Sequence, residues 1–170
     1  MTGLVLKAAE GGCLCGTIRY RIDAAVTESG YCHCRTCQRQ SGAPVVAWFA
    51  VTPSGFRYTA GSPKGFRASG HATREFCNDC GTYLLFREDD PEATLGVNTA
   101  TLDDPALVPP DFHIWHGSRI SWFETKDGFP RHARQVRKHT MIKLTFCLVR
   151  QPTLTREAFQ DYWLNKHAPL

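Results

Sequence analysis

Seven cysteines in three closely spaced groups constrain this sequence more than any other feature. The groups are Cys13-Leu14-Cys15, Cys32-His33-Cys34-Arg35-Thr36-Cys37 and Cys77-Asn78-Asp79-Cys80, and an eighth cysteine, Cys147, stands alone near the C-terminus. The N-terminal residues have no basic flank and no long apolar segment, so a secretory signal and a disulfide framework are not expected. Because thiolates in CxC and CxxC spacing are preferred zinc ligands, the sequence predicts zinc binding.

The spacing allows more than one grouping of the thiolates. Residues i and i+2 of a strand point to one side, so a CxC pair can hold one ion, and Gly81 can take the positive φ of a tight CxxC turn. One grouping closes a four-cysteine structural site formed by Cys13, Cys15, Cys77 and Cys80. Two alternatives stay open, namely a single structural zinc with spare thiols, and a site made of Cys13, Cys15, Cys32 and Cys34.

In the first grouping, three cysteines within six residues hold the second ion. Cys32, Cys34 and Cys37 leave a fourth coordination position open to water, substrate or a more distant side chain. Open positions are typical of catalytic zinc. His33, between two of these ligands, is interpreted as a residue that orients them rather than as a ligand itself.

Composition excludes several classes of protein. The 170 residues are 42% hydrophobic and 21% charged, which is typical of one soluble globular domain and not of a disordered chain. The longest apolar run covers residues 43–51 and includes Pro44, whereas a membrane helix needs about 20 residues. Seven thiolates on two zinc ions would reduce the formal charge of +4 to near +1, so the charge does not indicate nucleic-acid binding. A cytoplasmic location is expected.

Short β-prone segments separated by glycines predict a mainly β fold. Residues 1–10 are expected to be a weakly ordered lead-in. Ile18, Tyr20 and Ile22 alternate with polar residues and therefore share one face of a strand. Strands are expected over residues 18–22, 45–51, 57–58, 64–67, 82–86, 94–97, 113–116 and 120–123. Trp48, Phe49 and Trp122 are expected in the core.

The C-terminal part differs in kind. Residues 1–130 are predicted to form a zinc-binding β domain, and residues 131–140, with four basic side chains and no acidic one, a linker, or alternatively an anion-binding segment. Residues 141–149 alternate like a strand, and a helix capped by Thr155 follows. One strand and one helix cannot bury a core, so this tail, residues 141–170, is expected to dock on the first domain, to pair with another chain or to be a fragment of a longer domain. Cys147 is interpreted as an inert thiol.

The motifs resemble the glutathione-dependent formaldehyde-activating enzyme family over about residues 10–132. The resemblance is carried by Gly11-Gly12-Cys13-Leu14-Cys15-Gly16, by the run from Cys32 to Gly42, and by Arg74-Glu75-Phe76-Cys77-Asn78-Asp79-Cys80-Gly81-Thr82. Weaker matches are His113-Ile114-Trp115, Ser121-Trp122 and Gly128-Phe129-Pro130. The tail resembles the start of an EthD-type ferredoxin-like domain, and no function is transferred from that fragment.

The first resemblance implies a β-tent of small packed sheets with two zinc ions. It implies a structural zinc on Cys13, Cys15, Cys77 and Cys80, and a functional zinc on Cys32, Cys34 and Cys37. The family reaction joins glutathione to formaldehyde, giving S-hydroxymethylglutathione, and is classed as a carbon–sulfur lyase activity. Similar centromere-protein V-like proteins have no such established role.

The expected chemistry is thiol capture at the open zinc. A thiol bound there loses its proton and lies beside an aldehyde. Arg35, Arg39 and Arg74 could steer anionic glutathione, and His113 and His116 are either ordinary strand residues or part of the pocket wall. The competing hypothesis is a non-catalytic zinc module for protein interaction. We expect small-molecule substrates and a homodimer formed through the tail, and neither nucleic-acid nor membrane binding.

Overall fold

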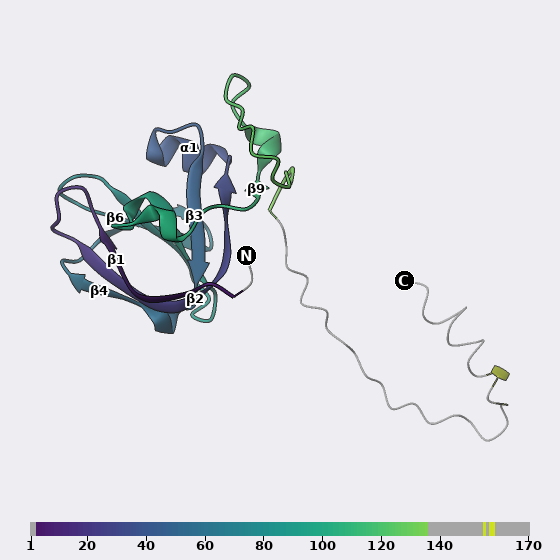
Figure 1. Ribbon diagram of the computed structural model, residues 1–170, viewed down its shortest axis with the longest axis horizontal. Helices are drawn as coiled ribbons and strands as arrows, with labels where there is room; N and C mark the ends of the chain where they lie inside the picture. The colour runs from purple at the N-terminus through teal and green to yellow at the C-terminus, as the bar shows by residue number, and fades with distance from the viewer. Residues whose placement is uncertain (1–2, 136–154, 156, 159–170) are drawn as a thin grey trace. The chain divides into compact units, whose positions relative to one another are not determined.

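The computed structural model describes residues 3–135, 155, 157 and 158. The chain divides into two units, residues 1–136 and 137–170, and the elements described below belong to the first (Figure 1). The predicted tail strand, Cys147, nearly all of the tail helix and the expected dimer contact lie outside the described residues. At Thr155, Oγ1 accepts a 3.1 Å hydrogen bond from the Ala158 N–H, as a helix N-cap does.

The described part of the first unit is mainly β, as the sequence predicted. Its strands are β1 (Val5–Gly12), β2 (Arg19–Cys32), β3 (Val46–Val51), β4 (Phe56–Ala60), β5 (Lys64–Ser69), β6 (Ala72–Phe76), β7 (Tyr83–Glu88), β8 (Leu95–Asn98) and β9 (His113–Ile114). One α-helix, α1 (Arg35–Ser41), and four short 3-10 turns complete the described elements. Among the described residues no helix is both long and apolar enough to cross a membrane.

Strand β2 organises the sheet because it is 14 residues long and has different partners along its length. Its first half pairs antiparallel with β1 and β4, and its second half pairs with β3. The sheet continues from β3 through β8, β7 and β6 to β5. At the end of β2, Tyr31 and Cys32 pair in parallel with the two residues of β9, so a segment near residue 113 lies beside the second cysteine group.

The core forms on the faces that alternation predicted. Ile18, Tyr20 and Ile22 are at most 1% exposed, and Phe49 is fully buried. The main cluster joins residues of β1, β2, β3, β7 and β8, and burying such side chains contributes roughly 1.5–3 kcal/mol each. A second, smaller apolar cluster is built on Cys32, Cys37, Val46, Tyr83 and Ile114. Through this cluster, Cys32 and Cys37 of the second cysteine group pack against side chains of the sheet.

Several local predictions were wrong. Most of the expected lead-in forms β1, which is held by pairing with β2 around a bulge where Ala8 has φ 54° and its N–H donates to Asp23. Residues 72–76 form β6, which the sequence analysis missed, and residues 120–123 form no strand. Trp122 is 74% exposed instead of buried. In β1, pairing with β2 therefore outweighs the weak β-propensity of the local sequence.

Candidate metal centre

The first and third cysteine groups meet in one four-thiol cluster. Cys13 and Cys15 lie in the turn after β1, and Cys77 and Cys80 lie in the turn between β6 and β7. All four sulfur atoms lie within 4.8 Å of one another, with 3.4 Å between Cys13 and Cys15 and 3.7 Å between Cys15 and Cys77. Four sulfurs around zinc at about 2.3 Å would lie about 3.8 Å apart, so the cluster fits a tetrahedral ion.

Backbone and hydroxyl groups hold this four-thiol cluster from outside. The Ile18 N–H donates to Cys13 Sγ at 3.2 Å. Thr82 Oγ1 lies 3.1 Å from Cys80 Sγ and accepts a hydrogen bond from the Leu14 N–H, which ties the two turns together. The hydrogen bond with Thr82 lowers the pKa of the Cys80 thiol to about 5, so a thiolate is available at neutral pH. With four thiols from the chain, the cluster could fill all four positions around a tetrahedral ion.

The second cysteine group forms a cluster of three thiols at the junction of β2 and α1. Cys32 ends β2, Cys34 is the N-cap of α1, and Cys37 lies in its first turn. Their sulfur atoms lie within 4.8 Å of one another, and the Cys37 N–H donates to Cys34 Sγ at 3.3 Å. No other histidine, cysteine or carboxylate among the described residues joins this cluster.

The helix that carries two of these thiols was not predicted. It begins because the Cys34 sulfur accepts a backbone hydrogen bond, as a serine N-cap would, and it ends because Gly42 adopts φ 68°. Hydrogen bonds from Cys32 and Cys37 lower the pKa of the Cys34 thiol to about 2, whereas the hydrogen bond to Cys34 raises the pKa of Cys32. Hydrogen bonds within the cluster therefore favour a thiolate among the three cysteines.

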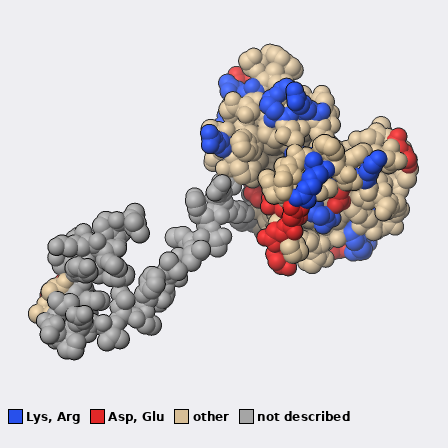
Figure 2. Space-filling model, turned by 180° about the vertical axis from the view of Figure 1, so that it is seen from behind, with Lys and Arg blue, Asp and Glu red and all other residues tan. Residues whose placement is uncertain are grey.

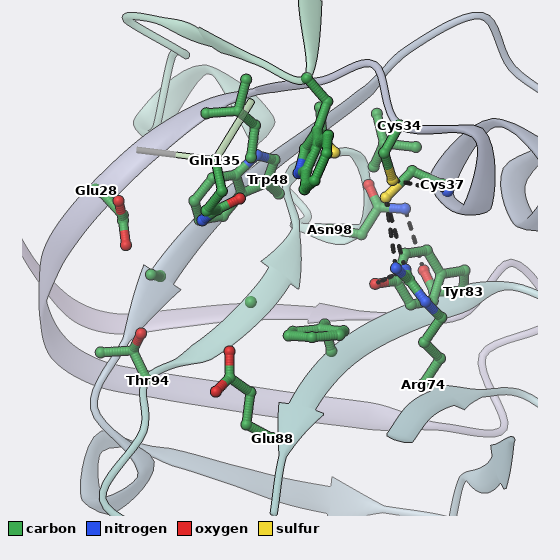
Figure 3. A pocket seen from close by; sticks show the side chains of 17 residues that line it. Glu28, Cys34, Cys37, Trp48, Arg74, Tyr83, Glu88, Thr94, Asn98 and Gln135 are labelled. Carbon is green, nitrogen blue, oxygen red and sulfur yellow. Dashed lines mark hydrogen bonds between the residues drawn. The ribbon is translucent and has the colours of Figure 1, made fainter. Parts of the chain in front are cut away.

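A cavity of about 200 Å³ opens directly onto the three-thiol cluster (Figure 3). Its lining combines the three thiols with aromatic rings, one arginine and two carboxylates. Besides Cys32, Cys34 and Cys37 the lining residues are Glu28, Val46, Trp48, Ala50, Arg74, Tyr83, Phe86, Glu88, Thr94, Gly96, Asn98, Ile114, Trp115 and Gln135. None of the four cysteines of the other cluster lines it. The two clusters therefore differ in the number of their thiols and in whether they line the cavity, although Cys15 of the four-thiol cluster is itself exposed.

Arg74 is a buried charged residue in direct contact with the three-thiol cluster. It is 7% exposed, and its Nη1 and Nη2 lie 3.7 and 3.6 Å from Cys37 Sγ. Nη1 also donates to the Tyr83 hydroxyl at 2.9 Å, and the guanidinium lies over the rings of Tyr83 and Phe86. No carboxylate among the described residues pairs with Arg74. Its charge therefore balances the thiolates of the cluster.

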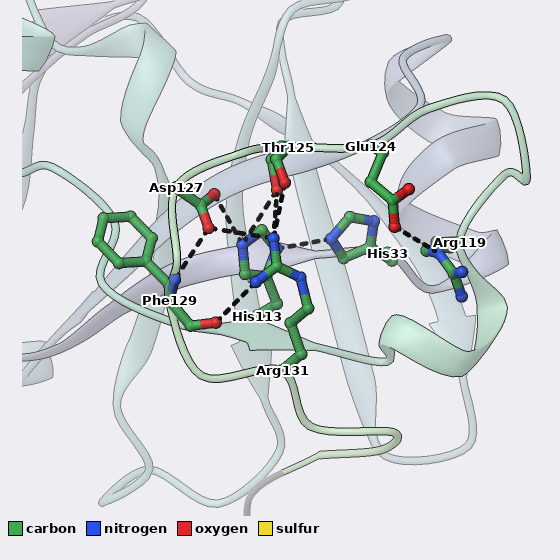
Figure 4. Close-up of polar contacts among 8 residues, drawn as sticks. All are labelled: His33, His113, Arg119, Glu124, Thr125, Asp127, Phe129 and Arg131. Atoms are coloured by element: carbon green, nitrogen blue, oxygen red, sulfur yellow. Dashed lines mark hydrogen bonds and ion pairs between the residues drawn. The ribbon is translucent and has the colours of Figure 1, made fainter.

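A chain of hydrogen-bonded polar side chains runs from His33, which lies between Cys32 and Cys34 in the sequence, through His113 to Asp127 (Figure 4). His33 Nε2 lies 2.8 Å from His113 Nδ1, and His113 Nε2 lies 3.0 Å from Asp127 Oδ2. Both imidazoles are at most 1% exposed. Partial burial raises the pKa of Asp127, but hydrogen bonds from the Phe129 N–H, Thr125 and His113 outweigh it and lower the value to about 2. The ionised Asp127 accepts a hydrogen bond from His113, and His113 in turn contacts His33, so these two contacts fix the His33 ring.

Hydrogen bonds to the backbone of His33 fix the segment that carries Cys32, Cys34 and Cys37. The His33 N–H donates to the Ile114 carbonyl at 3.0 Å, and the Gln38 side chain donates to the His33 carbonyl at 2.7 Å. Trp115, which follows β9 and lines the cavity, has φ 55°, a conformation uncommon for a bulky residue. This conformation is maintained by the packing of Trp115 against the small apolar cluster.

Of the other residues that the sequence analysis named, most lie outside the cavity. Arg35 and Arg39 are exposed on α1 and do not line the cavity, and neither His113 nor His116 lines it. Trp48 lines the cavity and is only partly buried. Arg131, assigned to the linker, donates to Asp127 and to the Thr125 carbonyl. Figure 2 shows basic and acidic side chains in small separate groups on one face.

The sequence analysis assigned no role in the site to Tyr83 or Asp127, and it quoted Trp115 only as part of a motif. A single tyrosine in a strand, a tryptophan after a strand and one carboxylate in a loop carry no spacing signal. Their roles depend on contacts between residues far apart in the chain, such as His113 with Asp127.

Comparisons with known proteins place this chain beside one family and beside individual proteins of two organisms. The family model described as glutathione-dependent formaldehyde-activating enzyme matches residues 8–118. An uncharacterized lyase of Schizosaccharomyces pombe is 31% identical over 77 residues, which cover 45% of this chain and 56% of that protein. The match thus spans little more than half the length of this curated relative. A crystal structure of a Rhodobacter sphaeroides protein is 28% identical, with a TM-score of 0.46, covering 55% of this chain and 87% of that one.

Proposed function

Because this chain belongs to the glutathione-dependent formaldehyde-activating enzyme family, we propose that it is a zinc-dependent lyase of the carbon–sulfur type. It would add glutathione or a related thiol to formaldehyde or another small aldehyde. The observation that carries the proposal is that the three-thiol cluster lines a cavity, whereas the four-thiol cluster does not. An incomplete ligand set facing a cavity is the arrangement expected of a site that binds substrate.

The donor sets support two zinc ions in the β-tent fold implied by the family. Cys13, Cys15, Cys77 and Cys80 would hold a structural ion, and Cys32, Cys34 and Cys37 a functional one. All-sulfur donors at these separations suit zinc better than a hard cation. A zinc ion in the three-cysteine site supplies positive charge that favours the thiolate form of a fourth, substrate thiol.

The chain's own residues would provide the rest of the chemistry. The reaction forms a C–S bond between the substrate sulfur and the carbonyl carbon, and the thiol proton ends on the carbonyl oxygen. Tyr83 lines the cavity, and burial raises its pKa, so the phenol keeps its proton. Its hydroxyl accepts from Arg74, which leaves its O–H free to donate to the aldehyde oxygen as negative charge develops there. Trp48, Phe86 and Trp115 would limit the access of water.

Catalysed exchange tests this proposal. The zinc-replete protein is expected to accelerate the interconversion of formaldehyde and S-hydroxymethylglutathione, measured by NMR exchange spectroscopy. The Cys34→Ser variant is expected to lose that acceleration. Exchange at the uncatalysed rate with a wild-type protein that holds two zinc ions would overturn the proposal.

A further inference from the structure

The floor of the cavity is one face of the sheet, and small side chains make it hollow. Across the strands, Glu28 of β2 pairs with Ala50 of β3, Ala50 with Gly96 of β8, and Gly96 with Phe86 of β7. A Cβ atom at Gly96 would lie 3.4 Å from the Phe86 Cβ. Ala50 and Gly96 therefore leave room between a carboxylate on one side and an aromatic ring on the other.

The two ends of the cavity carry opposite chemistry. Figure 3 shows Cys34, Cys37 and Arg74 at one end, with Glu28 and Glu88 at the other. In the described part of the chain, Glu28 and Glu88 have neither an ion pair nor a side-chain hydrogen bond. Arg74 is the only lysine or arginine in the lining, and it already contacts Cys37 and Tyr83.

The distance between the two ends suits an extended small molecule. Cys32 and Glu28 lie four residues apart on β2, which corresponds to about 13 Å between their Cα atoms. Along this length the lining includes Trp48 and Phe86, whose rings can contact a cation or an alkyl chain. A ligand whose sulfur reaches the three thiols would place a group about 10 Å away beside the carboxylates.

We propose that this cavity selects thiols whose far end carries a cationic group, with Glu28 and Glu88 as the residues that recognise it. The inference rests on the proposed function, because it assumes that the substrate sulfur binds at the three-thiol cluster. A cationic tail gains attraction from two unpaired carboxylates, whereas an anionic tail meets repulsion and finds no free arginine or lysine in the lining. Glutathione has one ammonium and two carboxylates, so its ammonium end would face these residues.

Binding of three matched peptides tests the inference. The probes are the N-acetylated, C-amidated dipeptides Cys-Lys, Cys-Gln and Cys-Glu, whose second side chains are cationic, neutral and anionic. Calorimetry with the zinc-replete full chain at low ionic strength is expected to give about tenfold tighter binding of Cys-Lys than of Cys-Glu, with Cys-Gln between them. The difference is expected to shrink as salt is added.

Variants identify the carboxylates responsible. In the Glu28→Gln, Glu88→Gln double variant the ranking should collapse to within about twofold, while Glu10→Gln, a carboxylate of β1 outside the lining, should preserve it. Equal binding of the three peptides by the wild-type protein would overturn this inference and leave thiol capture intact. A ranking that persists in the double variant would overturn the assignment to Glu28 and Glu88. Failure of all three peptides to bind would overturn the proposed function and this inference with it.

Discussion

The guanidinium of Arg74 lies against the sulfur of Cys37, with Nη2 3.6 Å and Nη1 3.7 Å from it. Arg74 comes from β6 and Cys37 from α1, so the contact joins the sheet to the helix that carries two of the thiols. A buried arginine without a carboxylate partner is costly unless another anion balances it. The thiolates of the three-cysteine cluster supply that anion, and cluster and arginine therefore stabilise each other.

Replacing Arg74 is expected to weaken metal binding at one site only. Arg74→Gln removes the charge that balances the thiolates, and zinc affinity at the three-cysteine site should fall by about 10–100-fold. Affinity at the four-cysteine site should not change. Competition with a coloured chelator resolves the two classes of zinc. Arg67→Gln, which removes an exposed ion pair with Asp89, serves as the control, and equal losses in both variants would contradict the account.

Two cysteine substitutions are expected to have different consequences. Cys34→Ser removes a ligand of the three-cysteine site, but serine is itself a good N-cap, so α1 should persist and the protein should fold with one zinc ion. Cys80→Ser opens the site that ties two turns together and should lower Tm by about 10 °C or more. Elemental analysis and thermal unfolding measure both effects. Global unfolding of Cys34→Ser would refute the division into structural and functional sites.

The Tyr83 hydroxyl should matter for rate more than for binding. Tyr83→Phe removes the proposed donor to the aldehyde oxygen, and the exchange rate should fall about 100-fold while thiol binding stays within about threefold. The matched control is Tyr58→Phe, whose hydroxyl donates to Glu75 and does not line the cavity. An unchanged rate in Tyr83→Phe would remove this residue from the mechanism.

His33 should stay neutral well into the acid range. Burial lowers the pKa of His33 to about 4, below the 6.5 of an unfolded chain. The folded protein then binds fewer protons than the unfolded chain between these values, so His33 makes the free energy of unfolding fall as pH drops from 6.5 towards 4. Imidazole nitrogen shifts in NMR measure the titration directly. A midpoint near 6.5 would show that the Asp127–His113–His33 chain does not shield this ring.

How much of this could be predicted from the sequence depends on whether a feature is local. Spacing and strand alternation were enough to propose the two groups of cysteines, and the structure brings the same seven residues together. The alternation of Ile18, Tyr20 and Ile22 likewise predicted a buried face. These patterns involve residues only a few positions apart, and over that distance the backbone geometry alone determines which side chains lie on the same face of a strand.

Features that depend on distant contacts were not predictable. Strand β1 has little β-prone pattern and exists because β2 pairs with it. Trp122 was expected in the core, but in the structure its side chain is 74% exposed. Arg74 was expected only to steer glutathione, and its contact with Cys37 depends on the position of β6. In each case the local pattern is weak and the deciding partner lies elsewhere in the chain.

Direct evidence of thiol coordination tests the central claim best. The protein is loaded with Co²⁺ in both sites, and its visible spectrum is recorded while the neutral Cys-Gln peptide is added. The account predicts a saturable difference spectrum with one equivalent of peptide per chain, corresponding to a change from three to four sulfur ligands at one site, and its absence in Cys34→Ser. A spectrum unchanged by the peptide in the fully loaded wild-type protein would contradict the claim that the three-cysteine site is open to substrate.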